Sequence, residues 1–205
     1  MKTFVSVLIA ALSIWAGETK PNPALPEGAV SLLGTVFQDC RLEWSSVGAL
    51  FGTGAEDIAA SFYCPSDVRK DSEGEAGPYA LALLKRDSAD QFRLAYSTRG
   101  LFSYIAPEIK RGSLSLHSSS VAIETAASYD YQFRYDGTHL ILIGMELDVI
   151  YTGSEMPPPK GVEYHVSANY LTNKYTDTRI GPYMQEIKEL KELPIEDFNF
   201  EMYGF

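Results

Sequence analysis

The sequence contains few of the residues that most often carry catalysis or bind metals. Among its 205 residues are only two cysteines and three histidines. It has no Gly-x-Ser-x-Gly nucleophile elbow, no His-Glu-x-x-His motif, no P-loop and no Ser-x-x-Lys motif. The histidines, His117, His139 and His165, are too far from one another in sequence to form a compact metal-binding motif. We therefore predict a non-enzymatic protein without a metal or other cofactor.

Long apolar runs are absent except at the N-terminus. Lys2 precedes an apolar segment at residues 4–15 that two serines interrupt, and Ala16 offers a small residue for cleavage. This pattern is typical of a signal peptide. The alternative, an uncleaved anchor, needs roughly 20 apolar residues. We interpret residues 1–16 as a signal peptide, and expect a periplasmic or secreted protein that is not inserted in the membrane after cleavage.

The two cysteines, Cys40 and Cys64, are 24 residues apart in sequence. An exported protein encounters an oxidising compartment, which favours a disulfide between them. The alternatives, a metal site or a catalytic thiol, would require further ligands or a nearby base, and the histidines are distant in sequence. We predict the disulfide.

Acidic residues outnumber basic ones by 27 to 17, for a formal net charge of −10. Cleavage after Ala16 removes Lys2 and no acid, which changes the charge to −11. This balance disfavours binding to nucleic acid or to an anionic lipid surface, and it suits a basic protein partner. The sequence carries no signal for an oligomeric state.

Residues 129–145 predict a β-hairpin. Asp136–Gly137 favours a two-residue turn, because both residues tolerate positive φ angles. Such a turn pairs Tyr135 with Thr138 and Arg134 with His139. One face of the hairpin then carries the large apolar side chains of Tyr131, Phe133, Leu140 and Leu142. The second strand is apolar on both faces, so we place it centrally in its sheet.

The rest of the chain predicts further short strands. Alternating or continuous apolar residues indicate hairpins at 79–85 with 92–98 and at 164–171 with 175–180, strands at 113–116 and 121–125, and a strand or short helix at 57–64. A three-residue spacing of apolar side chains predicts a helix at 183–193. We predict a mainly β fold, an antiparallel sheet of successive hairpins with one C-terminal helix, in a single domain at 36–205 after a flexible lead-in at 17–35.

Several of these segments resemble a loose group of exported bacterial proteins of unknown function, described as FG-GAP-like or VCBS-like. The similar segments are Leu81-Ala-Leu-Leu-Lys-Arg86, Tyr131-Gln-Phe-Arg-Tyr135, Leu140-Ile-Leu-Ile-Gly144 and Ser167-Ala-Asn-Tyr-Leu-Thr-Asn-Lys174. The resemblance implies a β-rich exported fold and no particular catalytic residue. The group's Asp-rich calcium segment is not kept at residues 53–60, where Glu56 and Asp57 supply too few oxygen ligands.

Two features suggest where the protein contacts a partner. Tyrosines are abundant, with 13 in the chain, and some lie near a loop of three consecutive prolines. We predict a contact surface for a protein or glycan formed by Met156, Pro157, Pro158, Pro159, Lys160, Tyr164 and Tyr170. The acidic segment at 67–75 is a second candidate loop. The alternative for the tyrosines is packing in the core.

The sequence therefore predicts an exported protein that binds another macromolecule in the cell envelope. One alternative is an inhibitor or immunity protein of an envelope hydrolase. A second is a glycan hydrolase with a carboxylate pair, although nothing singles out two of the 27 acidic residues. His117 lies next to three serines, but neighbouring residues on a strand point to opposite faces, so we predict no catalytic pair there.

Overall fold

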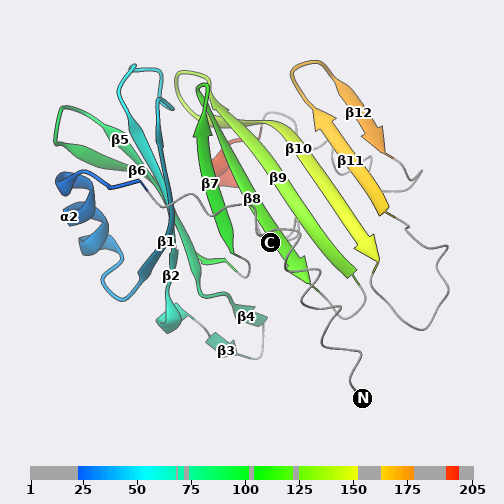
Figure 1. Ribbon diagram of the computed structural model, residues 1–205, viewed down its shortest axis with the longest axis horizontal. Helices are drawn as coiled ribbons and strands as arrows, with labels where there is room; N and C mark the ends of the chain where they lie inside the picture. The colour runs from blue at the N-terminus through cyan, green and yellow to red at the C-terminus, as the bar shows by residue number, and fades with distance from the viewer. Residues whose placement is uncertain are drawn as a thin grey trace.

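The structure is a computed structural model that describes residues 23–67, 69–71, 74–101, 104–121, 125–151, 163–177 and 193–198. These residues form mainly antiparallel β-hairpins, arranged in two sheets and a short ribbon (Figure 1). This confirms the predicted fold class. Residues 183–192 of the helix predicted at 183–193 lie outside the described residues, as does the signal peptide predicted at 1–16.

The smaller sheet has four strands in the order β1-β2-β5-β6. They are β1 (Arg41–Gly48), β2 (Asp57–Tyr63), β5 (Tyr79–Arg86) and β6 (Phe92–Leu101). The pairing of β5 with β6 confirms the first of the predicted hairpins. The acidic segment at 67–75, which was a candidate loop, begins at the end of η1 (Pro65–Asp67) and contains a ribbon of β3 (Arg69–Asp71) with β4 (Gly74–Ala76).

The larger sheet has six strands in the order β12-β11-β10-β9-β8-β7. They are β7 (Ile105–Lys110), β8 (Ser113–Val121), β9 (Thr125–Tyr135), β10 (Leu140–Tyr151), β11 (Glu163–Asn169) and β12 (Lys174–Asp177). As predicted, β10 is central. Asn173 adopts φ 52° in the β11–β12 turn, in the left-handed region that asparagine tolerates better than most residues.

The predicted register of the β9–β10 hairpin was wrong by two residues. Arg134 faces Ile141 rather than His139, so the turn contains four residues rather than two. The Asp136 carboxylate accepts hydrogen bonds from the N–H groups of Thr138 (2.7 Å) and His139 (2.8 Å), which stabilises the longer turn. A shift of two residues preserves the faces of a strand. The predicted core side chains of this hairpin are therefore buried: Tyr131, Phe133, Leu140 and Leu142.

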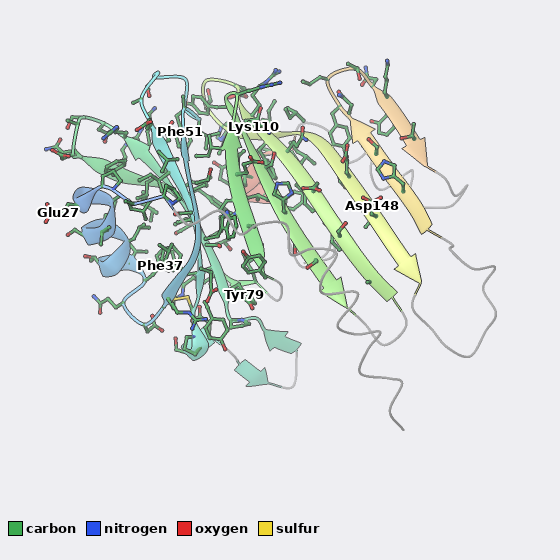
Figure 2. The ribbon with its side chains drawn as sticks, in the orientation of Figure 1. Glu27, Phe37, Phe51, Tyr79, Lys110 and Asp148 are labelled. Carbon is green, nitrogen blue, oxygen red and sulfur yellow. A yellow bond between two sulfur atoms is a disulfide. The ribbon has the colours of Figure 1, made fainter. Side chains whose placement is uncertain are left out.

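The prediction that residues 17–35 form a flexible lead-in was also wrong for its second half, because helix α2 (Glu27–Val36) forms there. Pro26 directly precedes the helix, a position at which a missing N–H costs little. Ala29 and Leu33 are buried against the outer face of the smaller sheet. Phe37 lies just after the helix (Figure 2), and its ring stacks on that of Phe62 at 4.4 Å between centroids.

The main core lies between the inner faces of the two sheets. Their edge strands β1 and β7 lie side by side, and the Ile109 N–H donates a 2.8 Å hydrogen bond to the Ser46 hydroxyl. Gly48 permits this approach, because a Cβ there would lie 2.8 Å from the Ile109 side chain. The short helix η2 (Ile195–Asp197) also belongs to this core through Ile195, and Phe198 packs 4.9 Å from the Tyr131 ring.

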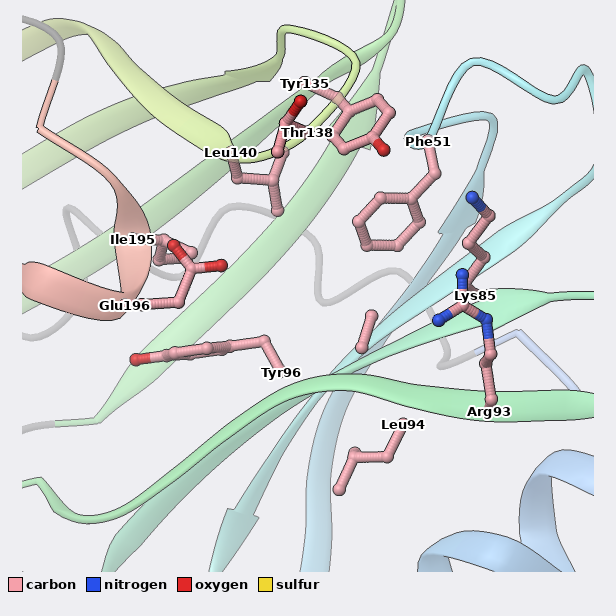
Figure 3. A pocket seen from close by; sticks show the side chains of 11 residues that line it. Phe51, Lys85, Arg93, Leu94, Tyr96, Tyr135, Thr138, Leu140, Ile195 and Glu196 are labelled. Atoms are coloured by element: carbon pink, nitrogen blue, oxygen red, sulfur yellow. The ribbon is translucent and has the colours of Figure 1, made fainter.

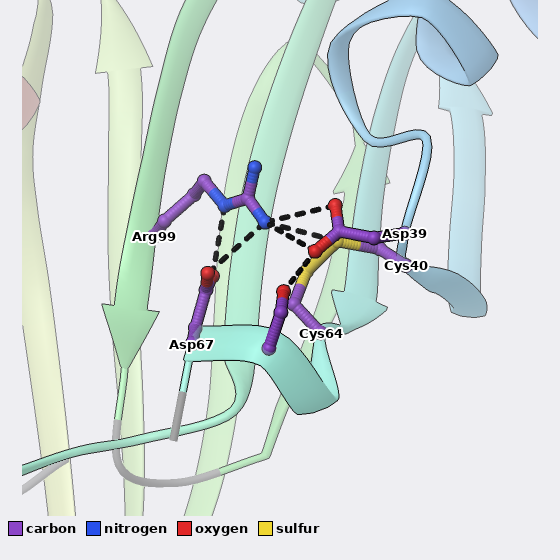
Figure 4. Close-up of polar contacts among 6 residues, drawn as sticks. Asp39, Cys40, Cys64, Asp67 and Arg99 are labelled. Atoms are coloured by element: carbon purple, nitrogen blue, oxygen red, sulfur yellow. Dashed lines mark hydrogen bonds and ion pairs between the residues drawn. A yellow bond between two sulfur atoms is a disulfide. The ribbon is translucent and has the colours of Figure 1, made fainter. Parts of the chain in front are cut away.

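The predicted disulfide between Cys40 and Cys64 is present, and it joins the start of β1 to the end of β2. Arg99 on β6 lies beside it and pairs with Asp67 at 2.8 Å and with Asp39 at 3.2 Å (Figure 4). These contacts tie three segments together at one end of the smaller sheet. In the described part of the chain, no helix is long and apolar enough to cross a membrane.

Candidate binding cleft

A cleft of about 150 Å³ opens between the two sheets (Figure 3). Its lining residue Phe51 lies at the end of the smaller sheet opposite the disulfide (Figure 2). The cleft lies where the β5–β6 hairpin faces the turn between β9 and β10. The aromatic and charged side chains that line it are those of Phe51, Lys85, Arg93, Tyr96, Tyr135 and Glu196. We call this the end cleft. These residues come from five separate segments of the chain, which the fold brings together.

A bulge in β6 creates one wall of the end cleft. Leu83 pairs with Tyr96 and Leu84 pairs with Leu94, so Ala95 is an extra residue in the ladder. In a regular strand, residues three apart point to opposite faces. Because of the bulge, Arg93 and Tyr96 both line the cleft.

Two cations lie at this wall. Lys85 and Arg93 are direct cross-strand partners, an arrangement that like charges disfavour. Arg93 Nε is 3.1 Å from the Asp87 carboxylate. The Lys85 ammonium lies 5.7 Å from the ring centroids of both Phe51 and Tyr135 and makes no ion pair with any described residue. The half-buried Lys85 is therefore held by aromatic faces rather than by an acid.

The opposite side of the end cleft carries Glu196, which belongs to η2 (Figure 3). Its carboxylate lies 3.7 Å from His139 Nδ1 in the β9–β10 turn. Tyr96 forms the floor, and burial raises the pKa of its hydroxyl to about 12, with a smaller contribution in the same direction from the charge of Glu196. The cleft therefore presents two basic side chains at one end, an acidic side chain at the other and a protonated phenol between them.

Asp57 fixes the positions of two walls of the end cleft relative to each other. Its buried carboxylate accepts hydrogen bonds from the N–H groups of Leu50 and Phe51, both at 2.8 Å, and of Arg86 at 3.1 Å. The first two bonds fix the loop that carries Phe51. The third fixes the end of β5 next to Lys85. Asp57 is thus a positioning residue for both side chains.

The wall formed by η2 is also anchored. The Leu142 N–H donates a 2.9 Å hydrogen bond to the Leu193 carbonyl, and Ile141 forms a β-bridge with Pro194. On the other side of Glu196, Phe198 packs into the core. The Tyr135 hydroxyl donates to the Gly137 carbonyl at 2.6 Å, which orients that ring.

The contact surface predicted from the sequence does not coincide with the end cleft. Tyr170 is only 3% exposed and packs in the core beside Tyr175, so its assignment to an exposed surface was wrong. Met156, Pro157, Pro158, Pro159 and Lys160 lie outside the described residues, as does the side chain of Tyr164. The cleft residues were missed because no local motif links positions between 51 and 196.

The histidines on the outer face of the larger sheet form cross-strand pairs with acids. His165 Nδ1 lies 2.7 Å from Asp148, and His117 Nδ1 contacts Asp130. Burial lowers the pKa of His117. The neighbouring Ser118 is buried on the opposite face, as the strand alternation predicts, so this serine and His117 do not form a catalytic pair. His139 does not face Arg134, contrary to the prediction.

Comparison with known proteins identifies no ligand for the end cleft. Within the described residues, no cluster of three or more histidine, cysteine or acidic side chains is arranged to hold a metal ion. No protein-family model matches the chain, and no curated protein sequence or solved structure is significantly similar to it.

Proposed function

We propose that this is an exported, non-enzymatic binding protein that holds a ring-sized group of an envelope macromolecule in the end cleft. One observation carries the proposal: an ammonium group without an acidic partner among the described residues faces a cleft walled by aromatic rings. The volume of about 150 Å³ equals that of an engineered cavity known to bind benzene, so a single ring is a suitable occupant.

The composition of the end cleft supports binding rather than glycan hydrolysis. A glycosidase site generally needs two carboxyl groups about 5–10 Å apart. The described lining contributes one, Glu196. The Cys40–Cys64 disulfide supports an oxidising location, in agreement with the signal peptide that the sequence predicts.

Affinity capture from the envelope fraction of the source organism tests this proposal. The full chain carries a C-terminal tag, and the retained proteins and glycans are identified by mass spectrometry. Thr138→Trp fills the cleft from its exposed rim, whereas Thr176→Trp adds the same bulk on the exposed strand β12. We expect the wild type and Thr176→Trp to retain the same macromolecule and Thr138→Trp to lose it.

If all three proteins retain the macromolecule equally, it does not bind through the end cleft. Equal retention of an envelope hydrolase would support the alternative, an inhibitor. The β3–β4 ribbon favours this second candidate, because it lies at the lower end of the smaller sheet, away from the cleft, and offers a separate protruding contact (Figure 1).

A further inference from the structure

We propose that the end cleft binds an acidic sugar, a pyranose ring that carries a carboxylate, as in a hexuronic acid. Lys85 binds the carboxylate, and Glu196 accepts hydrogen bonds from the hydroxyl groups at the far side of the ring. This inference rests on the proposed function and names the ligand class for the same site.

The arrangement of charge at the Lys85 end suits an anion. Lys85 is half-buried, its ammonium lies 5.7 Å from the centroids of two aromatic rings, and its cross-strand partner is Arg93. Asp87 pairs with Arg93, whereas Lys85 makes no ion pair with a described residue. A carboxylate at this position would relieve the repulsion between the two cations and add charge-assisted hydrogen bonds.

The middle of the end cleft suits a ring. Phe51 lies on one side and Tyr96 on the other, and both aromatic rings line the cleft (Figure 3). The C–H groups of a pyranose can pack on such faces, and the volume of about 150 Å³ admits one ring rather than a long chain. The protonated Tyr96 hydroxyl adds a hydrogen-bond donor or acceptor.

The Glu196 end distinguishes a sugar from other anionic rings. An ionised carboxylate only accepts hydrogen bonds, so it matches hydroxyl groups and repels a second carboxylate. Benzoate has a carboxylate and a ring but no hydroxyl group to donate. An aromatic amino acid carries its ammonium and carboxylate on one carbon, whereas the charges of the cleft lie on opposite sides (Figure 3). An acidic sugar has its carboxylate and several hydroxyls on different sides of the ring.

Titration with matched small molecules, followed by NMR or calorimetry, tests the inference. The probes are methyl β-glucuronide, its neutral counterpart methyl β-glucoside, benzoate and phenylalanine. We expect the glucuronide to bind at least about ten-fold more tightly than each of the other three. Lys85→Met keeps the side-chain stem and removes the charge, and we expect it to weaken glucuronide binding at least about ten-fold. Lys110→Met, on the exposed end of β7, serves as the control and leaves binding unchanged.

Other outcomes overturn the inference in distinguishable ways. Equal binding of benzoate and glucuronide means that the sugar hydroxyls are not recognised, and preferred binding of phenylalanine assigns an amino acid instead. If wild type and Lys85→Met bind the glucuronide with equal affinity and both melt cooperatively, Lys85 does not bind the carboxylate. If no probe binds while Thr138→Trp still abolishes capture, the ligand class is wrong and the proposed function stands. If capture is also unaffected, both fail.

Discussion

At the scale of single residues, the structure assigns its least obvious role to Asp57. The sequence suggested only that Glu56 and Asp57 supply too few oxygens for calcium. In the fold, the Asp57 carboxylate is fully buried and accepts three backbone hydrogen bonds. Its partners lie 6, 7 and 29 residues away, so a tertiary contact decides its role and no local pattern reveals it.

Asp57→Ala tests this role. The substitution leaves the buried N–H groups of Leu50 and Phe51 without acceptors, and each such group costs roughly 1–3 kcal/mol. We therefore expect the free energy of unfolding, measured by urea denaturation, to fall by about 3 kcal/mol. Asp90→Ala, on the exposed β5–β6 turn, should change it by less than about 0.5 kcal/mol. A similar small effect for both variants would contradict the positioning role.

Tyr96 predicts a pH dependence of stability. Its pKa is raised to about 12 by burial in the folded protein, against about 10 in an unfolded chain. The unfolded state therefore loses this proton at a lower pH. The resulting stability is fully present below about pH 10 and is lost as the pH rises toward 12. Compared with wild type, Tyr96→Phe should lose less stability between about pH 9 and pH 11 in urea denaturation. Identical slopes would contradict the assignment.

At the scale of elements, strands were more predictable than the helix. The alternation in Phe92, Leu94 and Tyr96 predicted a strand correctly, but it did not reveal the bulge at Ala95. Because of that bulge, Phe92 and Leu94 pack with the residues of helix α2, whereas Tyr96 packs against the main core between the two sheets. Helix α2 was missed because three prolines before it indicated a loose segment. The apolar spacing of Ala29, Leu32, Leu33 and Val36 was a usable helical signal.

Two glycines of α2 provide a matched test of its packing. A Cβ at Gly28 would collide with the Asp90 carbonyl, whereas at Gly34 it would meet nothing within 4 Å. Alanine favours a helix by about 1 kcal/mol relative to glycine. We expect Gly34→Ala to raise the free energy of unfolding by up to about 1 kcal/mol and Gly28→Ala to lower it, in urea denaturation. Stabilisation by both substitutions would show that α2 does not pack against the β5–β6 turn.

At the scale of the whole molecule, the sequence predicted antiparallel hairpins and the disulfide but not their division into two sheets. A hairpin is decided by neighbouring residues and its turn. The meeting of β1 with β7 depends on Ser46, Gly48 and Ile109, which are distant in sequence. The end cleft has the same origin, because it forms only after both sheets and η2 are assembled.

The disulfide should contribute to global stability because it closes a segment of 24 residues. Chain-entropy reasoning assigns such a loop on the order of 3 kcal/mol. We expect the double variant Cys40→Ala/Cys64→Ala to lose roughly this amount in urea denaturation, and reduction of the wild type to have a similar effect. An unchanged free energy of unfolding in the double variant would contradict this expectation.

The most direct test of the central claim, that ligand binds in the end cleft, is a residue-resolved NMR titration of the full chain with methyl β-glucuronide. We expect the largest saturable shift changes at Phe51, Lys85, Tyr96 and Glu196, which only the folded cleft brings together. Saturable changes confined to the outer face of the larger sheet, around His165, would contradict the account and move the binding site there.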